Sequence, residues 1–599
     1  MSKRTRSQGT GTKGTGTQGA GTGNYARPLP REPLTLGQAA EWQEQPRTSD
    51  PDSFDQESLP ADLVHQRLHR LHPAELLNDY LEIQTVEDEE AESLNTVFEL
   101  PRSKPTGGYI RYENTLKNHA VPCQDAKSLE RRSRQKKLET AIYDGTYVDG
   151  GPFTAAQPIE IFYPPFADLK QKLHDPAFKP DLAILDQIHS LMNVASLITT
   201  EAKFRWQLLP KLQDILEHHI ADILSEDGYH PDGMMFTEID QCMIPLLIWQ
   251  IKKALGEGGC DVTAQVIYSA LEKWQDGRLA RFRERCPCPT LLLINAGSHS
   301  TVLGVIWADR FIVQRLSDIG FLGYDSFCHD DQIHNIACLF TVLRGFLNDL
   351  KQYYHGLDLN NIRPLQRHLP HPRFFPQCLR YFCRERKTLI TIEYVRAIDD
   401  DECTNLAYVA KDADGREVLV KFFDRCGYEA HQLLADADCA PTLYYVGLVD
   451  GEHDVSHSEE ARGTMLPFGL YKGPIRMNVM EYLKGKHAGD MPRDQWPTDA
   501  HAQLKDAVGL LHAQGYVFGD LRHPNVIFSP RSSADGPPSP AGSSHNYKAK
   551  LIDLDWSGKE EDVYYPAGLS TIARWTEGVE SFKQIKKEHD LAMLDRHFG

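Results

Sequence analysis

The sequence contains no apolar run that approaches the roughly 20 residues needed to cross a bilayer, so no membrane-spanning helix is expected. It lacks the apolar stretch of a secretory signal near its N-terminus, which favours an intracellular, reducing compartment. Its 12 cysteines show no paired CxxC spacing, and Cys286 and Cys288 form the only close pair. A structural zinc site is therefore not expected.

Positive charge is in the minority. The chain has 65 Lys and Arg residues and 84 Asp and Glu residues, so its formal net charge is -19. Phosphate contacts need clustered Lys and Arg, so this balance disfavours nonspecific binding of nucleic acid by the whole chain. It leaves room for a local basic site. The one dense basic cluster is Arg131, Arg132, Arg134, Lys136 and Lys137. Such a cluster is typical of a nuclear localisation signal, of a phosphate-contacting patch or of an exposed helix face. The nucleus is therefore one candidate location and the cytoplasm the other.

At 599 residues the chain is too long for a single core. The first segment is a Gly/Thr/Gln repeat that cannot bury apolar area, so a disordered basic tail is expected there. Leucines recur at helical spacing over residues 59–83, and apolar residues at 330–354 predict a long amphipathic helix. Strands are expected at 159–163, 234–239, 245–251, 290–295 and 302–307, and residues 526–528 and 549–552 should pair as a hairpin. The expected units are the tail at 1–28, a partly helical region at 29–150, a folded domain at 151–355, a Pro- and His-rich linker at 356–379, and a second folded domain at 380–599 with a disordered insert at 532–546.

Two stretches near the C-terminus carry residues suited to phosphoryl transfer. HAQGYVFGDLRHPN, residues 512–525, contains Asp520 and Asn525, and KLIDLDWSG, residues 550–558, delivers Asp553 from an apolar strand. Phosphoryl transfer needs one carboxylate to orient and deprotonate an acceptor hydroxyl. It also needs an amide oxygen and a second carboxylate to hold magnesium. Asp520, Asn525 and Asp553 fit these three roles.

Upstream, EVLVKFF at residues 417–423 predicts a strand with Lys421 in its middle, and Glu429 follows on an expected helix at 428–435. A strand lysine that touches the nucleotide phosphates and pairs with a helix glutamate is the remaining part of such a site.

With these motifs in order, residues 380–599 resemble a protein-kinase-like domain. More narrowly, they are similar to the kinase-like module of fungal, chiefly basidiomycete, proteins with FGDLR-x-x-N and LIDxDW-x-G. The resemblance implies a bilobal fold, ATP and Mg²⁺ as cofactors, and an unidentified protein substrate phosphorylated on Ser or Thr. It also implies that NVMEYL, residues 478–483, is the hinge at which Glu481 and Leu483 bind adenine.

Three positions depart from the family pattern. Phe518-Gly519 stand where typical kinases have His-Arg, and Asp555 stands where they have the glycine of Asp-Phe-Gly. No G-x-G-x-x-G loop precedes Lys421. A pseudokinase scaffold without catalysis therefore stays open beside the active phosphotransferase.

A second constellation lies within residues 151–355. Asp232 begins one strand-like run, and Gln250 and Lys252 end the next. Glu201 lies on a helix before them and Gln265 on a helix after them. In the PD-(D/E)-x-K nuclease fold, an acid on one strand and an acid or amide on the next strand hold magnesium. The lysine stabilises or helps generate the attacking hydroxide. The alternative is that Lys252 merely caps a core strand at the surface.

Residues 151–355 therefore resemble a restriction-endonuclease-like domain of α/β class, with DNA as the implied partner. Its pairing with a kinase-like domain resembles fungal Crinkler-type and related mobile-element-associated proteins. The fold class expected for the whole chain is multidomain α+β. A third candidate function is a nuclease-like, DNA-associated effector regulated by the kinase-like domain.

Overall fold

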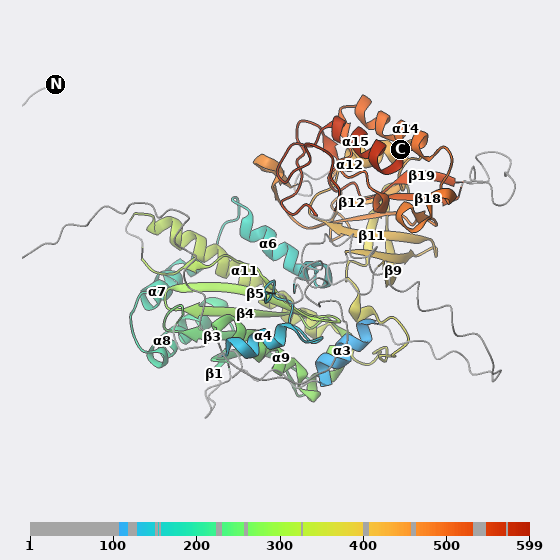
Figure 1. Ribbon diagram of the computed structural model, residues 1–599. Helices are drawn as coiled ribbons and strands as arrows, with labels where there is room; N and C mark the ends of the chain where they lie inside the picture. The colour runs from blue at the N-terminus through green and yellow to red at the C-terminus, as the bar shows by residue number, and fades with distance from the viewer. Residues whose placement is uncertain are drawn as a thin grey trace, which may run out of the picture. The chain divides into compact units, whose positions relative to one another are not determined.

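The computed structural model describes eleven parts of the chain (Figure 1). They are residues 107–117, 128–149, 154, 157–222, 231–256, 261–324, 327–398, 406–456, 463–530, 547–570 and 573–599. The predicted tail at 1–28, the leucine-spaced helix at 59–83 and the insert at 532–546 lie outside these residues. Within them, no helix is long and apolar enough to cross a membrane.

The first domain is built on a seven-stranded sheet of order β1-β2-β3-β4-β5-β6, with β7 paired to β5. Its strands are β1 Ala221–Asp222, β2 Gly233–Ile239, β3 Cys242–Lys252, β4 Thr290–Ala296, β5 His299–Trp307, β6 Phe311–Arg315 and β7 Gly320–Phe321. Only the pair β3 and β4 is parallel. Strands predicted at 234–239, 245–251, 290–295 and 302–307 are confirmed. Their long apolar runs fit central strands that are buried on both faces.

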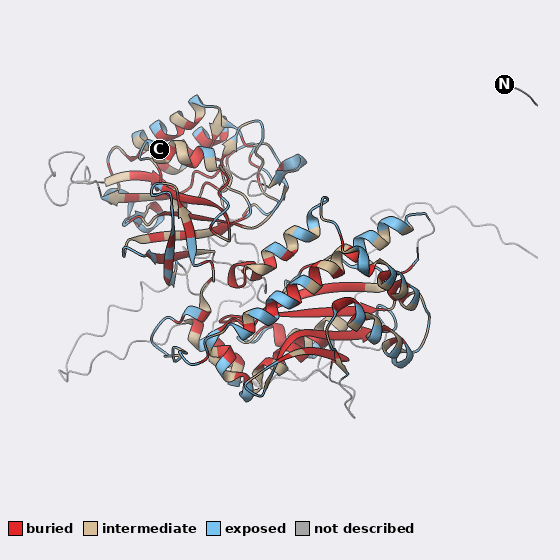
Figure 2. Cartoon of the chain, turned by 180° about the vertical axis from the view of Figure 1, so that it is seen from behind, coloured by how far each residue is buried: buried red, intermediate tan, exposed pale blue. Residues whose placement is uncertain are grey.

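Helices cover both faces of this sheet (Figures 1 and 2). Helix α9, Val262–Gln275, packs against β3 and β4, whereas α8, Glu201–Leu216, and α11, His329–His355, reach β3 from the other side. The predicted long amphipathic helix at 330–354 is thus confirmed. The shorter helices are α3 Gly107–Lys117, α4 Leu129–Lys136, α5 Ile159–Phe162, α6 Pro165–His174, η2 Leu182–Ile184, α7 Leu185–Ala195, η3 Gly277–Leu279, α10 Ala280–Arg285 and η4 Pro372–Phe374.

The strand expected at 159–163 is wrong, because this segment forms α5. All four residues of α5 are buried, so there is none of the in-and-out alternation of a half-buried strand. Pro158 precedes the helix with a φ of -59°. That value suits the start of a helix, and this offers a physical reason for the difference.

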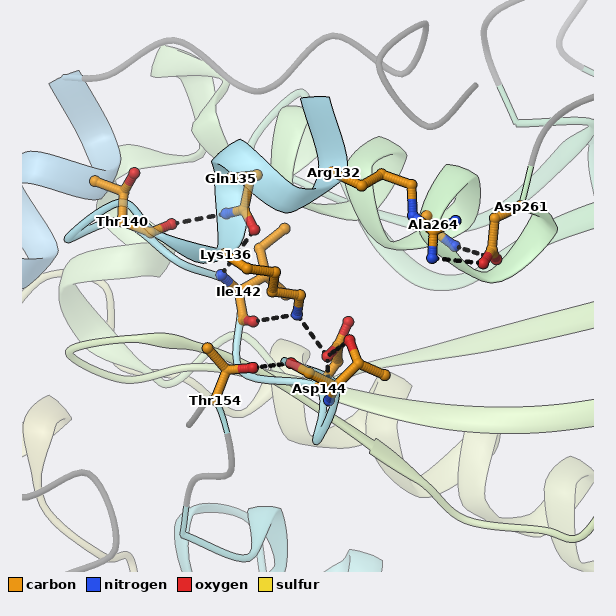
Figure 3. Close-up of polar contacts among 10 residues, drawn as sticks. Arg132, Gln135, Lys136, Thr140, Ile142, Asp144, Thr154, Asp261 and Ala264 are labelled. Atoms are coloured by element: carbon orange, nitrogen blue, oxygen red, sulfur yellow. Dashed lines mark hydrogen bonds and ion pairs between the residues drawn. The ribbon is translucent and has the colours of Figure 1, made fainter. Parts of the chain in front are cut away.

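The basic cluster lies on and just after α4, and part of it is committed to contacts within the chain (Figure 3). Lys136 is buried, and its Nζ donates to Ile142 O at 2.7 Å and to Asp144 Oδ1 at 2.5 Å. Burial lowers the pKa of Lys136, while Asp144 opposes that change. Arg132 forms an ion pair of 2.7 Å with Asp261, the N-cap residue of α9. The cluster is therefore not a uniformly exposed basic face.

Residues predicted as the linker make specific contacts. Arg373, in η4, is 2% exposed, and its Nη2 donates to Trp307 O at 2.7 Å. Its guanidinium carbon also lies 4.1 Å from the centroid of the Tyr112 ring.

The second domain begins with a six-stranded antiparallel sheet of order β12-β15-β11-β10-β9-β8. Its strands are β8 Arg380–Cys383, β9 Thr388–Ala397, β10 Ala407–Asp412, β11 Glu417–Phe423, β12 Leu443–Leu448 and β15 Arg476–Glu481. Helix α12, Tyr428–Asp436, follows β11. The predicted strand at 417–423 and helix at 428–435 are confirmed. Between β12 and β15 lie β13 Thr464–Met465, η5 Pro467–Gly469 and β14 Tyr471–Lys472.

The rest of this domain is centred on two helices, α14 Ala500–Ala513 and α15 Lys587–Phe598. The short elements around them are β16 Lys486–His487, η6 Ala488–Asp490, η7 Arg493–Gln495, β17 Tyr516–Val517, η8 His523–Asn525, β18 Val526–Pro530, β19 Tyr547–Leu551 and β20 Gly558–Lys559. Strands β18 and β19 form the predicted hairpin. Leu504, Leu511 and Phe518 pack with Leu551 and Met593 in a shared core.

Candidate functional site

Asp520 lies in the loop between β17 and β18, where Arg522 holds its carboxylate. Arg522 Nε donates to Asp520 Oδ1 at 2.5 Å and Nη2 donates to Oδ2 at 2.8 Å. The two side chains are only 7% and 8% exposed. The guanidinium carbon of Arg522 also lies 4.5 Å from the ring centroid of Trp575. Such a bidentate, charge-assisted pair fixes the orientation of the Asp520 carboxylate.

Asn525 and Asp553 come together because the β18–β19 hairpin joins the segments that carry them. Ile552 N–H donates to Asn525 O at 3.0 Å, directly before Asp553. Asn525 Nδ2 donates to Asp520 O at 2.9 Å, which turns the amide oxygen toward other partners. Asp553 has a φ of 58°, in the left-handed region that residues other than glycine rarely adopt. Strain of this kind occurs where the surrounding structure fixes a functional side chain.

Lys421, in the middle of β11, reaches the same place. Its Nζ donates to Asp553 Oδ1 at 2.6 Å and to Asp555 Oδ2 at 2.8 Å. Burial by itself lowers the pKa of Lys421, but the charges of Asp553 and Asp555 outweigh it and raise the pKa above its ordinary value. Burial raises the pKa of Asp555 to about 7, with the ammonium of Lys421 opposing. The structure thus gathers the predicted residues Lys421, Asp520, Asn525 and Asp553.

Glu429 is the predicted residue that the structure does not bring to Lys421. It lies exposed in the first turn of α12. The buried residues of this helix are Ala430, His431 and Leu434. Because successive helix residues are rotated by about 100°, burial of these three leaves Glu429 on the outer face. The predicted strand and helix both form, but in this structure the helix carboxylate does not pair with the lysine.

Asp590, on α15, anchors the loop that carries Asp520. It is fully buried and accepts hydrogen bonds at 2.8 Å from the backbone N–H groups of Phe518 and Gly519. His512 Nε2, on the last turn of α14, lies 3.0 Å from Asp590 Oδ2. Sequence reasoning missed this residue because a single Asp in an amphipathic helix gives no local signal.

The Phe518-Gly519 departure has a conformational basis. Gly519 has a φ of 90°, a backbone conformation that residues other than glycine rarely adopt. A Cβ atom at this position would lie 3.0 Å from Ile585 Cδ1 and 3.3 Å from Trp556 Cβ. Glycine therefore lets the loop approach the segment before α15.

The predicted hinge, residues 478–483, comprises the last residues of β15 and the two residues after it. Glu481 N–H donates to Thr442 O at 2.9 Å, and the Glu481 carboxylate accepts from Thr442 N–H at 3.2 Å and lies 3.5 Å from Lys550 Nζ. Leu483 is buried two residues later. The side chain of Glu481 therefore ties the hinge to neighbouring strands, and backbone groups at Glu481 and Leu483 are the ones that adenine recognition would use.

The second predicted cluster forms at the end of β3. Lys252 Nζ donates to Glu201 Oε1 at 3.1 Å. Asp232 Oδ2 accepts from Ile251 N–H at 2.9 Å and from the side-chain amide of Gln250. Gln250 is 1% exposed, and its Oε1 has no hydrogen-bond partner among the residues that the structure describes. Four of the five predicted residues, Glu201, Asp232, Gln250 and Lys252, thus lie together.

Two further residues complete the picture of this cluster. Arg205, one turn after Glu201 on α8, has its Nη1 3.5 Å from Asp232 Oδ1. Burial raises the pKa of Asp232, while the Ile251 N–H, Lys252 and Arg205 oppose that change. Gln265 is buried in the first turn of α9, on the predicted helix.

Both clusters combine carboxylates with an amide side chain, a donor set that suits magnesium. Within the described residues, no group of three or more His, Cys, Asp and Glu side chains is arranged to hold a metal ion. Amide oxygens, from Asn525 in one cluster and Gln250 in the other, would therefore have to share the coordination.

Over part of its length the chain is similar to a protein-kinase-like protein. It is 25% identical over 148 residues to the EKC/KEOPS complex subunit BUD32 of Chaetomium globosum, which covers 24% of this chain. The chain spans 48% of that relative, about half its length. No protein-family model matches.

A solved structure is also similar, that of the kinase PK-1 from the Cydia pomonella granulovirus. The match has 10% sequence identity and a TM-score of 0.23, and it covers 34% of this chain and 65% of the viral one. The expected fungal origin and the Crinkler-type and restriction-endonuclease-like resemblances stay predictions.

Proposed function

We propose that residues 380–599 form a phosphotransferase that moves the terminal phosphate of ATP to a hydroxyl group, with Ser or Thr of a protein as the acceptor. The observation that carries this proposal is the convergence of Lys421 from β11 and Asp553 from the β19 end on the loop that holds Asp520 and Asn525. Partial similarity to a kinase-like protein supports it.

Each residue has a defined task in such a transfer. Asp520 orients the acceptor hydroxyl and takes its proton as the new oxygen–phosphorus bond forms and ADP departs. Lys421 has three ammonium hydrogens, and two already bind carboxylates, so one is left for a phosphate oxygen. Asn525 Oδ1 and Asp553 would hold magnesium, which when bound neutralises charge on the phosphates.

Removal of magnesium gives the first test. The full chain, incubated with γ-labelled ATP, Mg²⁺ and casein or myelin basic protein, should transfer label, and EDTA should reduce transfer to background. Thermal denaturation with and without MgATP runs beside it. Absent transfer together with an ATP-induced shift would instead support a pseudokinase that binds nucleotide, and absence of both would leave a scaffold.

A second candidate function is favoured by one observation in the first domain. The Oε1 atom of Gln250 is buried beside Asp232 with no hydrogen-bond partner in the described part of the chain, and an amide oxygen in that state is suited to bind a cation. The element order α8, β2, β3, α9, β4 supports the restriction-endonuclease-like resemblance. We therefore infer metal-dependent hydrolysis of DNA as the candidate activity of residues 151–355, with the kinase-like domain as its regulator.

Lysine replacement tests that second activity. In full-length protein, Lys252→Ala should reduce Mg²⁺-dependent nicking of supercoiled plasmid by about 10²-fold or more, because the charge that stabilises the attacking hydroxide is lost. Lys253→Ala, at the exposed neighbouring position, is the matched control and should nick normally. Nicking that persists unchanged in Lys252→Ala would remove the assignment.

A further inference from the structure

We propose that Asp555 is the positioning residue for Lys421, in the place that a helix glutamate fills in protein kinases. One short segment, Asp553 to Asp555, then supplies both a metal ligand and the anion that aligns the phosphate-binding lysine. This inference rests on the proposed phosphotransferase function and deepens it.

A lysine that binds phosphate needs an anion to hold it, because its flexible side chain otherwise samples many rotamers. Protein kinases supply that anion from the helix after the lysine strand. Here α12 offers none to Lys421, since Glu429 is exposed on its outer face. The inward-facing polar residue of α12 is His431, whose Nε2 lies 2.9 Å from Pro441 O. Burial lowers the pKa of His431 to about 4, so it is neutral at pH 7.

Asp555 is placed to take over that task. Its Oδ2 accepts from Lys421 Nζ at 2.8 Å, and the two side chains are 30% and 20% exposed. Leu554 between the two aspartates is buried, and its carbonyl accepts from Gly427 N–H at 2.9 Å. Anchored through Leu554, the segment presents Asp553 and Asp555 to the same ammonium.

Asp553 and Asp555 have different roles in this arrangement. Asp553 is also the predicted magnesium ligand, so its oxygens are shared between a cation and Lys421. Among the contacts of the described residues, Asp555 hydrogen-bonds only to Lys421. Asp424 and Asp553 are among the other titratable groups that act on Asp555, and both disfavour its charge. The lysine is therefore the partner that Asp555 stabilises.

A difference in control follows from this arrangement. Where a helix glutamate holds the lysine, movement of the helix switches the site on and off. Here Asp553 and Asp555 hold Lys421, so the alignment of the lysine does not depend on a carboxylate of α12. Regulation of this site would instead act on the segment from Asp553 to Ser557. This segment is also bonded to the loop of Asp520, because Ser557 Oγ donates to Phe518 O at 3.0 Å.

The test compares four variants of the full chain. Asp555→Asn removes the charge with little change of shape, and Asp555→Glu restores a carboxylate. Glu429→Gln removes the competing helix carboxylate. Asp562→Asn removes an exposed carboxylate elsewhere in the same part of the chain and serves as the charge control. Thermal denaturation of each variant establishes that it folds.

Two readouts are measured. The first is the rate at which an N-hydroxysuccinimide ester acylates Lys421, followed by peptide mass spectrometry without nucleotide. Asp555→Asn should speed this by about 3- to 10-fold, because Lys421 then loses one of the two carboxylates that hold its side chain in place. The second is kcat and KM for MgATP. Asp555→Asn should lower kcat/KM by about 10- to 100-fold, with partial recovery in Asp555→Glu.

The outcomes separate the two proposals. Faster acylation in Asp555→Asn, with Glu429→Gln and Asp562→Asn at the wild-type rate, supports the role of Asp555 even if the wild type transfers no phosphate. If phosphate transfer is then absent, the result counts against the proposed phosphotransferase function and not against the role of Asp555. Acylation that changes in Glu429→Gln and not in Asp555→Asn would overturn the inference.

Discussion

Full-length protein with Asp520→Asn should transfer phosphate about 10²- to 10⁴-fold more slowly than the wild type. An amide cannot take the proton of the acceptor hydroxyl, so the loss should appear in kcat. The KM for MgATP should change little, because the proposed role of Asp520 is to orient the acceptor, and the proposed nucleotide contacts come from other residues. Steady-state kinetics with labelled ATP measures both quantities.

Two controls give that experiment its meaning. Asn retains an oxygen that accepts from Arg522, so the buried guanidinium keeps a partner and the variant should fold. Asp562→Asn removes an exposed carboxylate elsewhere in the same domain and should leave transfer unchanged. Wild-type kcat in Asp520→Asn would show that another group accepts the proton and would refute the assignment.

Replacement of Asp590 by alanine should have the largest structural effect. It leaves the buried N–H groups of Phe518 and Gly519 without an acceptor and removes the partner of His512. Loss of a buried, multiply bonded carboxylate costs about 3–5 kcal/mol. Hydrogen–deuterium exchange over residues 516–525 should therefore accelerate strongly, and phosphate transfer should fall because Asp520 loses its fixed position.

The matched control lies on the same helix. Asp595 is exposed, and its carboxylate is 3.5 Å from His501 Nε2. Asp595→Ala should leave both exchange and transfer close to wild type, since exposed ion pairs contribute about 1 kcal/mol or less. Equal protection of residues 516–525 in Asp590→Ala and Asp595→Ala would show that the loop does not need its anchor.

Most of the strands and the long helices could be predicted, because their signals are local. Apolar runs marked β3, β4 and β5, and helical spacing marked α11. The motif residues Asp520, Asn525 and Asp553 could be placed together because the hairpin between them was visible in the sequence. The failure at α5 also has a local cause, since a short segment with three apolar side chains, Ile159, Ile161 and Phe162, between prolines suits a short helix as well as a strand.

The missing parts of the site depend on geometry that no local pattern reveals. Glu429 was one residue out of phase with the buried face of α12, and only packing decides that phase. Asp555 was noted as a departure, but its contact with Lys421 requires the register that brings β11 to the segment after β19. Asp590 reaches Phe518 across 72 residues, and a separation of that size is invisible to spacing arguments.

That long separation also bears on the order of events during protein synthesis. A nascent chain that has emerged as far as Asp553 already contains Lys421, Asp520 and Asn525. Their loop cannot be fixed until Asp590 has followed, because its acceptor oxygens come from α15. Contacts between distant residues form late in folding. An unfinished chain therefore carries the chemical groups of the site without the buried acceptor that fixes their loop.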